Sequence, residues 1–160
     1  MTKKLISAAA LAIALVPAAA SAAVQTAAPA PNVNLTTTTG ATISLEALRG
    51  RPVYLDFYAT WCPYCKAETP TIEALQKTPG KNVVIVGIDE EESAPIVRQF
   101  AARNGLTYTM ALDPNGSAGD TFGADVLPTN VFIDRNGNIS SIHAGEMTAS
   151  EIEGALKQIE

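Results

Sequence analysis

Two cysteines, Cys62 and Cys65, are the only ones in the chain, and their position constrains its fold more than any other feature. Before them, the apolar run Val53–Tyr58 predicts a buried strand. After them, the pattern over residues 63–78 predicts a helix, since a proline at its start is tolerated in the first turn. The two thiols therefore stand where a buried strand ends and a helix begins.

This position gives the two thiols unequal chemistry. A helix N-terminus has unsatisfied N–H groups and the positive end of the helix dipole, and both stabilise a thiolate. We expect Cys62, at or just before the first turn and partly exposed, to be the attacking sulfur. Cys65 lies one turn deeper, where it can resolve a mixed disulfide.

Two other interpretations of the pair are weaker. A structural zinc site needs four ligands, and besides the cysteines the chain offers one distant histidine, His143. An inert structural disulfide would close only a four-residue loop and would stabilise the fold little. We therefore expect a redox-active Cys62–Cys65 disulfide, with no metal and no other cofactor.

Residues 1–22 have the composition of a secretory signal peptide. Lys3 and Lys4 give a basic start, Leu5–Val16 is an apolar run of 12 residues, and small residues at 20–22 offer a cleavage site. The run is shorter than the ~18–20 apolar residues that cross a bilayer, which favours cleavage over an uncleaved membrane anchor. We expect a periplasmic protein.

The charge of the exported part excludes some partners. Loss of residues 1–22 removes two lysines, which shifts the formal net charge from −5 to −7. An acidic domain without a basic cluster argues against nucleic acid and against anionic membrane surfaces. The acidic run Glu90–Glu92 is interpreted as the solvated start of a helix, and no function is assigned to it.

The rest of the chain predicts one domain. Residues 23–31, rich in alanine and proline, predict a flexible lead-in, and residues 32–160 predict an α/β domain. A β-hairpin, a β-α-β-α-β run, a second hairpin and a closing helix give a mixed sheet flanked by helices. The predicted strands cover 32–36, 41–44, 53–58, 83–88, 107–112, 130–133 and 139–144, and the predicted helices 63–78, 93–104, 116–122 and 148–159, with Ser93 and Thr148 as N-caps.

Three segments in order carry a family resemblance. They are Gly40–Gly50, then Val53–Pro70 with its Trp61-Cys-Pro-Tyr-Cys65, then Val126-Leu-Pro-Thr129 with Val131–Gly137. Together they resemble the thioredoxin superfamily, in particular its secreted TlpA/ResA-like branch, from about residue 32 to the C-terminus. The resemblance implies a thioredoxin fold with an N-terminal β-hairpin extension and a thiol-disulfide oxidoreductase that acts on protein thiols and disulfides.

The resemblance also implies a substrate-binding surface around the cysteines. Pro128 matches a cis-proline that faces the disulfide and leaves the backbone of Leu127 free to pair with a substrate strand. Trp61 is expected to shield Cys62, and Tyr64 to tune the pair sterically. The expected substrate-binding residues are Trp61, Pro63, Tyr64, Leu127, Pro128 and Thr129.

Two acids are the expected proton acceptors for Cys65. Asp56 lies in an otherwise apolar strand, where burial should raise its pKa, and it matches the buried acid of thioredoxins. Glu68 lies three residues after Cys65 on the same helical face, and it matches a glutamate beneath the cysteines of the ResA-like branch. The alternative for Glu68 is a solvated helix position.

The residues between the cysteines depart from that branch. ResA-like proteins often carry Glu-Pro there, whereas Pro63-Tyr64 gives the Cys-Pro-Tyr-Cys of glutaredoxins. Trp61, Asp56 and the export signal argue against a glutaredoxin. A DsbA-like oxidase would need a large helical insertion, and one predicted helix at 93–104 leaves no room for it.

The sequence therefore predicts a periplasmic monomer that reduces protein disulfides, with apocytochrome c as a candidate substrate. A membrane electron donor of the DsbD/CcdA type would return it to the reduced form. Two alternatives stay open: a dithiol oxidase or isomerase-like exchanger, and a non-catalytic binding module on the same fold. The presence of both cysteines argues against the binding module.

Overall fold

One mixed sheet of seven strands organises the part of the chain that the computed structural model describes, residues 26–78, 80 and 82–160. The strand order is β2-β1-β5-β4-β3-β6-β7. The strands are β1 Asn34–Thr37, β2 Thr42–Ser44, β3 Val53–Tyr58, β4 Val84–Glu90, β5 Thr109–Asp113, β6 Thr129–Ile133 and β7 Ile139–Ala144. The predicted signal peptide, residues 1–22, lies outside the described residues.

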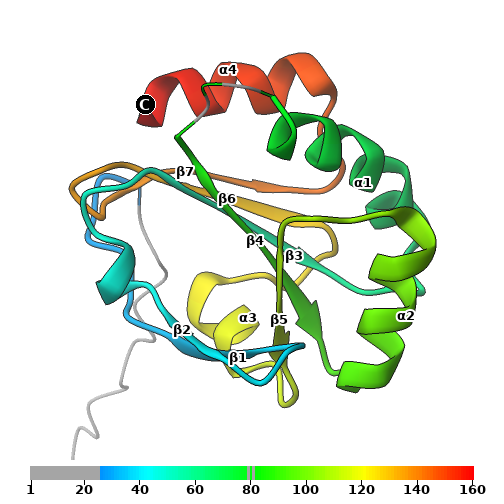
Figure 1. The fold of residues 1–160 in the computed structure, drawn as a ribbon. Helices are drawn as coiled ribbons and strands as arrows, with labels where there is room; N and C mark the ends of the chain where they lie inside the picture. The colour runs from blue at the N-terminus through cyan, green and yellow to red at the C-terminus, as the bar shows by residue number, and fades with distance from the viewer. Residues whose placement is uncertain (1–25, 79, 81) are drawn as a thin grey trace, which may run out of the picture.

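Helices cover both faces of this sheet. They are α1 Pro63–Gln76, α2 Ala94–Asn104, α3 Ser117–Phe122 and α4 Ala149–Ile159, with a short 3-10 helix, η1, at Glu46–Leu48. Figure 1 shows α1 and α4 side by side over one face and α3 on the opposite face. Side chains of α1, α2 and α4 share one buried core, and those of α3 belong to the other. The predicted mixed sheet with flanking helices is confirmed.

Strand β3 lies inside the sheet, between β4 and β6, and leads directly to the cysteines. It pairs in parallel with β4 and antiparallel with β6, and its six residues are all buried. Because side chains alternate along a strand, Tyr54 and Tyr58 enter the core beneath α1, whereas Leu55 and Phe57 enter the core beneath α3. Asp56 therefore shares the α1 side with the two tyrosines.

Local sequence signals place most of the helix ends. Thr148 caps α4 in a reciprocal capping box with Glu151, as predicted, and Gly105 ends α2 with φ 63°. Ser93 stands at the N-cap of α2, but its side chain makes no capping hydrogen bond. Helix α1 ends at Gln76, two residues earlier than predicted. Every described helix falls short of the length and apolarity that a bilayer span requires.

The acidic run at 90–92 is not the start of a helix, so that interpretation was wrong. Strand β4 continues to Glu90, because its parallel pairing with β5 extends to Glu90 opposite Asp113. Glu91 then has φ 64°, which ends the extended conformation of the strand, and α2 begins only at Ala94. The run therefore lies at the carboxyl end of a central strand, beside the cysteines' own strand.

Residues 27–30, predicted as part of a flexible lead-in, are instead paired with residues 137–139, at the end of the β6–β7 turn and the first residue of β7. Ala27 N donates to Ile139 O at 2.7 Å, Ala30 N donates to Gly137 O at 2.8 Å, and a bridge joins Pro29 to Asn138. The reason is that the carbonyl and N–H groups next to the β6–β7 turn are free to pair with a further segment.

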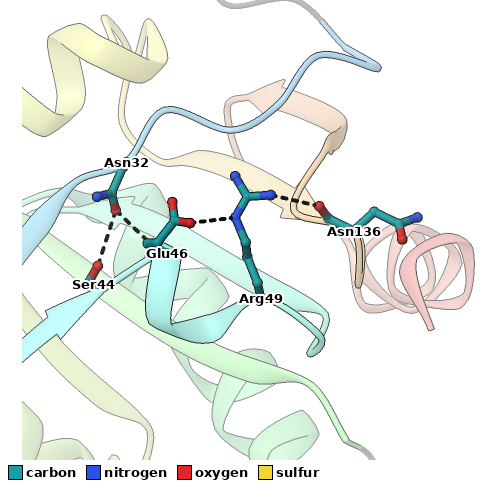
Figure 2. Close-up of polar contacts among 5 residues, drawn as sticks. All are labelled: Asn32, Ser44, Glu46, Arg49 and Asn136. Carbon is teal, nitrogen blue, oxygen red and sulfur yellow. Dashed lines mark hydrogen bonds and ion pairs between the residues drawn. The ribbon is translucent and has the colours of Figure 1, made fainter.

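Polar side chains attach the N-terminal hairpin to the same turn (Figure 2). Asn32 Oδ1 accepts hydrogen bonds from Ser44 and from the Glu46 N–H at 3.2 and 3.1 Å. Arg49 pairs with Glu46 at 3.3 Å and donates to the Asn136 carbonyl at 3.2 Å. Leu45 and Leu48 of this segment pack against the core beneath α3, whereas the cysteines belong to the core beneath α1.

Candidate active site

Cys62 and Cys65 form a disulfide at the N-terminus of α1. Cys62 is the N-cap residue, and its Sγ accepts a hydrogen bond from the Cys65 N–H at 3.2 Å. Pro63 follows in the first turn, where its missing N–H leaves no helix bond unmade. A sulfur held in this way, at the positive end of a helix, is stabilised as a thiolate when the disulfide is reduced.

Both cysteines are buried, which corrects the expectation that Cys62 is partly exposed. Cys62 is 3% exposed and Cys65 is 2% exposed in the disulfide form. The reason is that both residues belong to the core shared by α1, α2 and α4. Cys62 still lines a surface groove of about 650 Å³, and Cys65 does not. The two cysteines therefore differ in their contact with the groove and not in their exposed fraction.

The groove brings together most of the predicted substrate-binding residues. Trp61 and Tyr64 are 65% and 63% exposed, so two large aromatic surfaces flank the sulfur. The residues that line the groove are Trp61, Cys62, Pro63, Tyr64, Glu90, Glu91, Glu92, Ala124, Asp125 and Leu127. Pro128 and Thr129 are not among them.

The loop before β6 closes one side of the site. The Leu127–Pro128 peptide bond is cis, as predicted, and the Leu127 carbonyl oxygen lies 3.7 Å from Cys62 Sγ. The buried Thr129 hydroxyl donates to the Val126 carbonyl at 2.6 Å, so this side chain supports the loop from below. Of the three predicted loop residues, Leu127 is the one that meets the groove.

Glu68 is buried in α1, which excludes the solvated position considered for it. Its Oε1 accepts hydrogen bonds from the Met147 N–H at 3.0 Å and from Asn130 Nδ2 at 3.2 Å. Burial raises the pKa of Glu68 to about 7, and the two hydrogen bonds oppose this rise. An acid with that pKa can gain and lose a proton at neutral pH.

Asp56, on β3, is a second buried carboxyl group of the site. Burial raises the pKa of Asp56 well above its usual value, and the charge of Glu68 raises it further. In the described part of the chain, Asp56 Oδ1 has no hydrogen-bond partner. A buried carboxyl in this state is stable when protonated, which is the form that a proton acceptor reaches after transfer.

Asn130 is a site residue that the sequence argument missed. It lies opposite Asp56 in the β3–β6 register and is fully buried beneath α1. Its amide joins Glu68 to Tyr54, whose hydroxyl donates to Asn130 Oδ1 at 2.5 Å. The sequence did contain a signal for it. Asn130 is a polar residue between Thr129, the last residue of the cis-proline motif, and Val131 in the strand that follows.

The acidic run forms the other side of the groove. The carboxylate of Glu92 accepts hydrogen bonds from the Thr60 N–H at 2.5 Å and from the Thr60 hydroxyl at 2.8 Å, two residues before Cys62. Burial raises the pKa of Glu90 to about 7, with a further contribution from Asp113. Burial likewise raises the pKa of Asp89 to about 8, with the Glu92 charge adding to it. Because it accepts the two hydrogen bonds from Thr60, Glu92 positions the turn that carries the disulfide.

Comparison with known proteins agrees with this geometry. The Redoxin family matches residues 25–159. The thiol-disulfide oxidoreductase ResA of Bacillus thuringiensis (strain Al Hakam) is 36% identical over 121 residues, which cover 75% of this chain and 70% of that protein.

Two solved structures extend the comparison to the fold. A thiol:disulfide interchange protein of the thioredoxin family from Chlorobium tepidum has a TM-score of 0.73 at 27% identity, over 86% of this chain and 99% of that one. A secreted disulfide oxidoreductase of Mycobacterium tuberculosis, homologous to E. coli DsbE, has a TM-score of 0.71 at 26% identity, over 79% of this chain and 95% of that one.

Proposed function

The chain belongs to the redoxin family, with the thioredoxin fold and the activity of a thiol-disulfide oxidoreductase, and from this we propose that it is a periplasmic reductase of protein disulfides. Residues 1–22 would direct its export, and residues 32–160 would act as a monomer. Its substrates would include apocytochrome c, whose haem-binding cysteines must be reduced. A membrane donor of the DsbD/CcdA type would return electrons to Cys62–Cys65, the only redox group that the reaction needs.

One observation carries the proposal. Cys62 lines an open groove at the start of α1, whereas Cys65 lies behind it with the buried acid Glu68 one turn further along the same helix. This arrangement separates the sulfur that meets a polypeptide from the sulfur that needs a proton acceptor. Both requirements belong to a two-step exchange.

The first step is attack on the substrate. The Cys62 thiolate attacks one sulfur of a substrate disulfide, a Cys62–substrate disulfide forms, and the other substrate sulfur leaves as a thiolate that takes a proton from water. The helix N-terminus and the Cys65 N–H stabilise the attacking thiolate. The exposed faces of Trp61 and Tyr64 and the Leu127 backbone would hold the substrate strand against the groove.

The second step releases the product. Cys65 loses its proton to the acid pair Asp56 and Glu68, and its thiolate attacks Cys62 Sγ. The mixed disulfide breaks, the second substrate sulfur leaves as a thiolate, and the Cys62–Cys65 disulfide forms. Two electrons have then passed to the substrate, and an exchange with the donor dithiol restores both thiols.

A dithiol oxidase is the second candidate, and one observation favours it. The N-cap position stabilises a Cys62 thiolate, and a more stable thiolate makes the disulfide more oxidising. The buried acids act in the opposite direction, since negative charge at Asp56 and Glu68 opposes thiolate formation. The apolar Leu127 before the cis-proline, as in ResA-like proteins, leads us to prefer the reductase.

Alkylation trapping of intact cells separates the two candidates. A reductase should be recovered with Cys62 and Cys65 reduced, and loss of the membrane donor should shift the pair to the disulfide. A strain without the gene should lose covalent haem staining of c-type cytochromes, and the wild-type gene should restore it where Cys62→Ser does not. An oxidised pair at steady state, together with efficient oxidation of reduced substrates, would establish the oxidase instead.

A further inference from the structure

Three buried side chains connect the sheet to α1 by hydrogen bonds. The Tyr54 hydroxyl donates to Asn130 Oδ1 at 2.5 Å, and Asn130 Nδ2 lies 3.2 and 3.4 Å from the two carboxylate oxygens of Glu68. Tyr54 and Asn130 are fully buried, and Tyr54 also stacks on Phe132 at 4.7 Å between ring centroids. The amide is therefore held between a phenol and an acid.

The surroundings fix the direction of these hydrogen bonds. Asn130 Nδ2 also donates to the Gly145 carbonyl at 3.3 Å, and a flipped amide would place two acceptors in contact there. Burial raises the pKa of Tyr54 well above its usual value, so the hydroxyl keeps its proton and remains a donor. Asn130 consequently offers an N–H to Glu68 whether or not that acid is charged.

A donor of fixed direction favours the charged form of the acid. A buried carboxylate is unstable unless hydrogen bonds replace its water, and donors that face it lower the cost of the charge. Among the described residues, Glu68 has two such donors, Asn130 and the Met147 N–H, and of these only Asn130 donates through a side chain that a substitution can remove. The amide therefore opposes the effect of burial directly.

We propose that Asn130 is a positioning residue that holds the carboxylate of Glu68 charged and aligned, one helical turn after Cys65, ready to take the Cys65 proton. The inference rests on the proton transfer in the proposed function and names the residue that controls it. Without the amide, Glu68 stays protonated at neutral pH, and the second step of the exchange loses a base.

The other groups around Glu68 do not supply this stabilisation. Asp56 and Glu146 are acids, and Tyr108 is a buried phenol whose pKa is raised by burial. His143 pairs with Asn130 in the β6–β7 register, but its side chain is exposed. The titratable or charged groups to consider in any pH profile are Tyr54 and Asp56 on β3, Tyr108 on β5, Glu146 before α4, His143 on β7 and the cysteines on α1.

The direct test is the titration of Glu68 by NMR. Glutamate side chains are labelled with ¹³C at the carboxyl carbon, Glu68→Gln assigns the signal, and the oxidised protein is titrated so that no thiol contributes. Asn130→Leu removes the amide at similar volume and should raise the Glu68 midpoint by about one to two pKa units. Thr69→Val is the matched control: it removes a buried hydroxyl on the next residue, bound to the Cys65 carbonyl, and should leave the midpoint in place.

A second variant keeps the test decisive if Asn130→Leu does not fold. Tyr54→Phe keeps the stacked ring and removes only the donor to Asn130, so the Glu68 midpoint should rise by a smaller amount. A midpoint unchanged in the folded Asn130→Leu protein, or in Tyr54→Phe where that variant alone folds, overturns the proposal. The titration measures the Glu68 midpoint without any turnover. A wild-type protein that reduces no disulfide would therefore contradict the proposed function, but it would not change the measured effect of Asn130 on Glu68.

Discussion

The carbonyl oxygen of Leu127 lies 3.7 Å from Sγ of Cys62, so the loop that ends in the cis-proline reaches the sulfur at the groove. A substrate strand that pairs with this loop would bring its own sulfur to Cys62 before it could approach Cys65. The contact therefore explains why Cys62, the sulfur nearer the groove, reacts with the substrate before Cys65.

The first prediction follows from that order. Cys65→Ser should accumulate a mixed disulfide with substrate, because Cys62 attacks and nothing resolves the product. Cys62→Ser should trap little, since Cys65 does not line the groove. Gel shifts under non-reducing conditions after reaction with a substrate protein measure both. Equal trapping by the two variants would mean that the assigned roles are wrong.

The second prediction concerns proton transfer. Asp56→Asn and Glu68→Gln should each slow the release of the mixed disulfide, the double variant most of all, while the first attack stays nearly intact. Because the pKa of Glu68 is raised to about 7, the wild-type release rate should increase as pH rises through that value, and Glu68→Gln should remove this increase. Stopped-flow mixing resolves the two steps. Unchanged release in the double variant refutes the relay, and an effect of Asp56→Asn alone removes Glu68 from it.

The features of this site that could be predicted from the sequence are those that short sequence motifs determine. The strand before Cys62, the proline in the first turn, the cis bond before Pro128 and the burial of Asp56 all depend on short motifs. Asn130 was missed because its role depends on the β3–β6 register, which sets it opposite Asp56 across 74 positions of sequence.

The acidic run Glu90–Glu92 was predicted wrongly for the same reason, because long-range strand pairing decides its structure. Local composition favours the start of a helix at Glu90–Glu92, and no local signal indicates that β5 extends β4 by two residues. The long-range bond from Thr60 to Glu92 likewise arises only when β3 and β4 lie side by side. The burial of Cys62 was also misjudged, because packing of three helices on one face decides it.

The third prediction is a stability profile with a definite sign. An unfolded glutamate titrates near 4.3, whereas Glu68 in the folded protein titrates near 7, so the folded state binds more protons between these values. This contribution to stability is fully present below about pH 4.3 and is lost as pH rises through 7, at up to about 1.4 kcal/mol per pH unit. Urea unfolding of the oxidised protein should show this decline, and Glu68→Gln should make it shallower by the share of Glu68, since Asp56, Asp89 and Glu90 keep their raised pKa values. A Glu68→Gln profile parallel to that of the wild type would contradict the assignment.

The fourth prediction tests the turn before the cysteines. Glu92→Ala should lower the free energy of unfolding by about 1–3 kcal/mol, because the Thr60 N–H and hydroxyl lose their acceptor. It should also change the rate of reaction of Cys62, whose turn is then free to move. Glu91→Ala is the control, since that exposed side chain lines the same groove and the backbone bond of its N–H to Asp113 is retained. Equal effects of the two variants would show that Glu92 acts only through its charge.

The central claim, that the reduced Cys62/Cys65 pair reduces protein disulfides, is tested most directly by the redox equilibrium of the pair. Trp61 is the only tryptophan and precedes Cys62, so its fluorescence can follow the oxidation state in thiol-disulfide buffers. We predict one two-electron transition, absent in Cys62→Ser and Cys65→Ser, with a potential more negative than about −200 mV. A potential near that of DsbA, about −120 mV, would contradict the account and establish an oxidase.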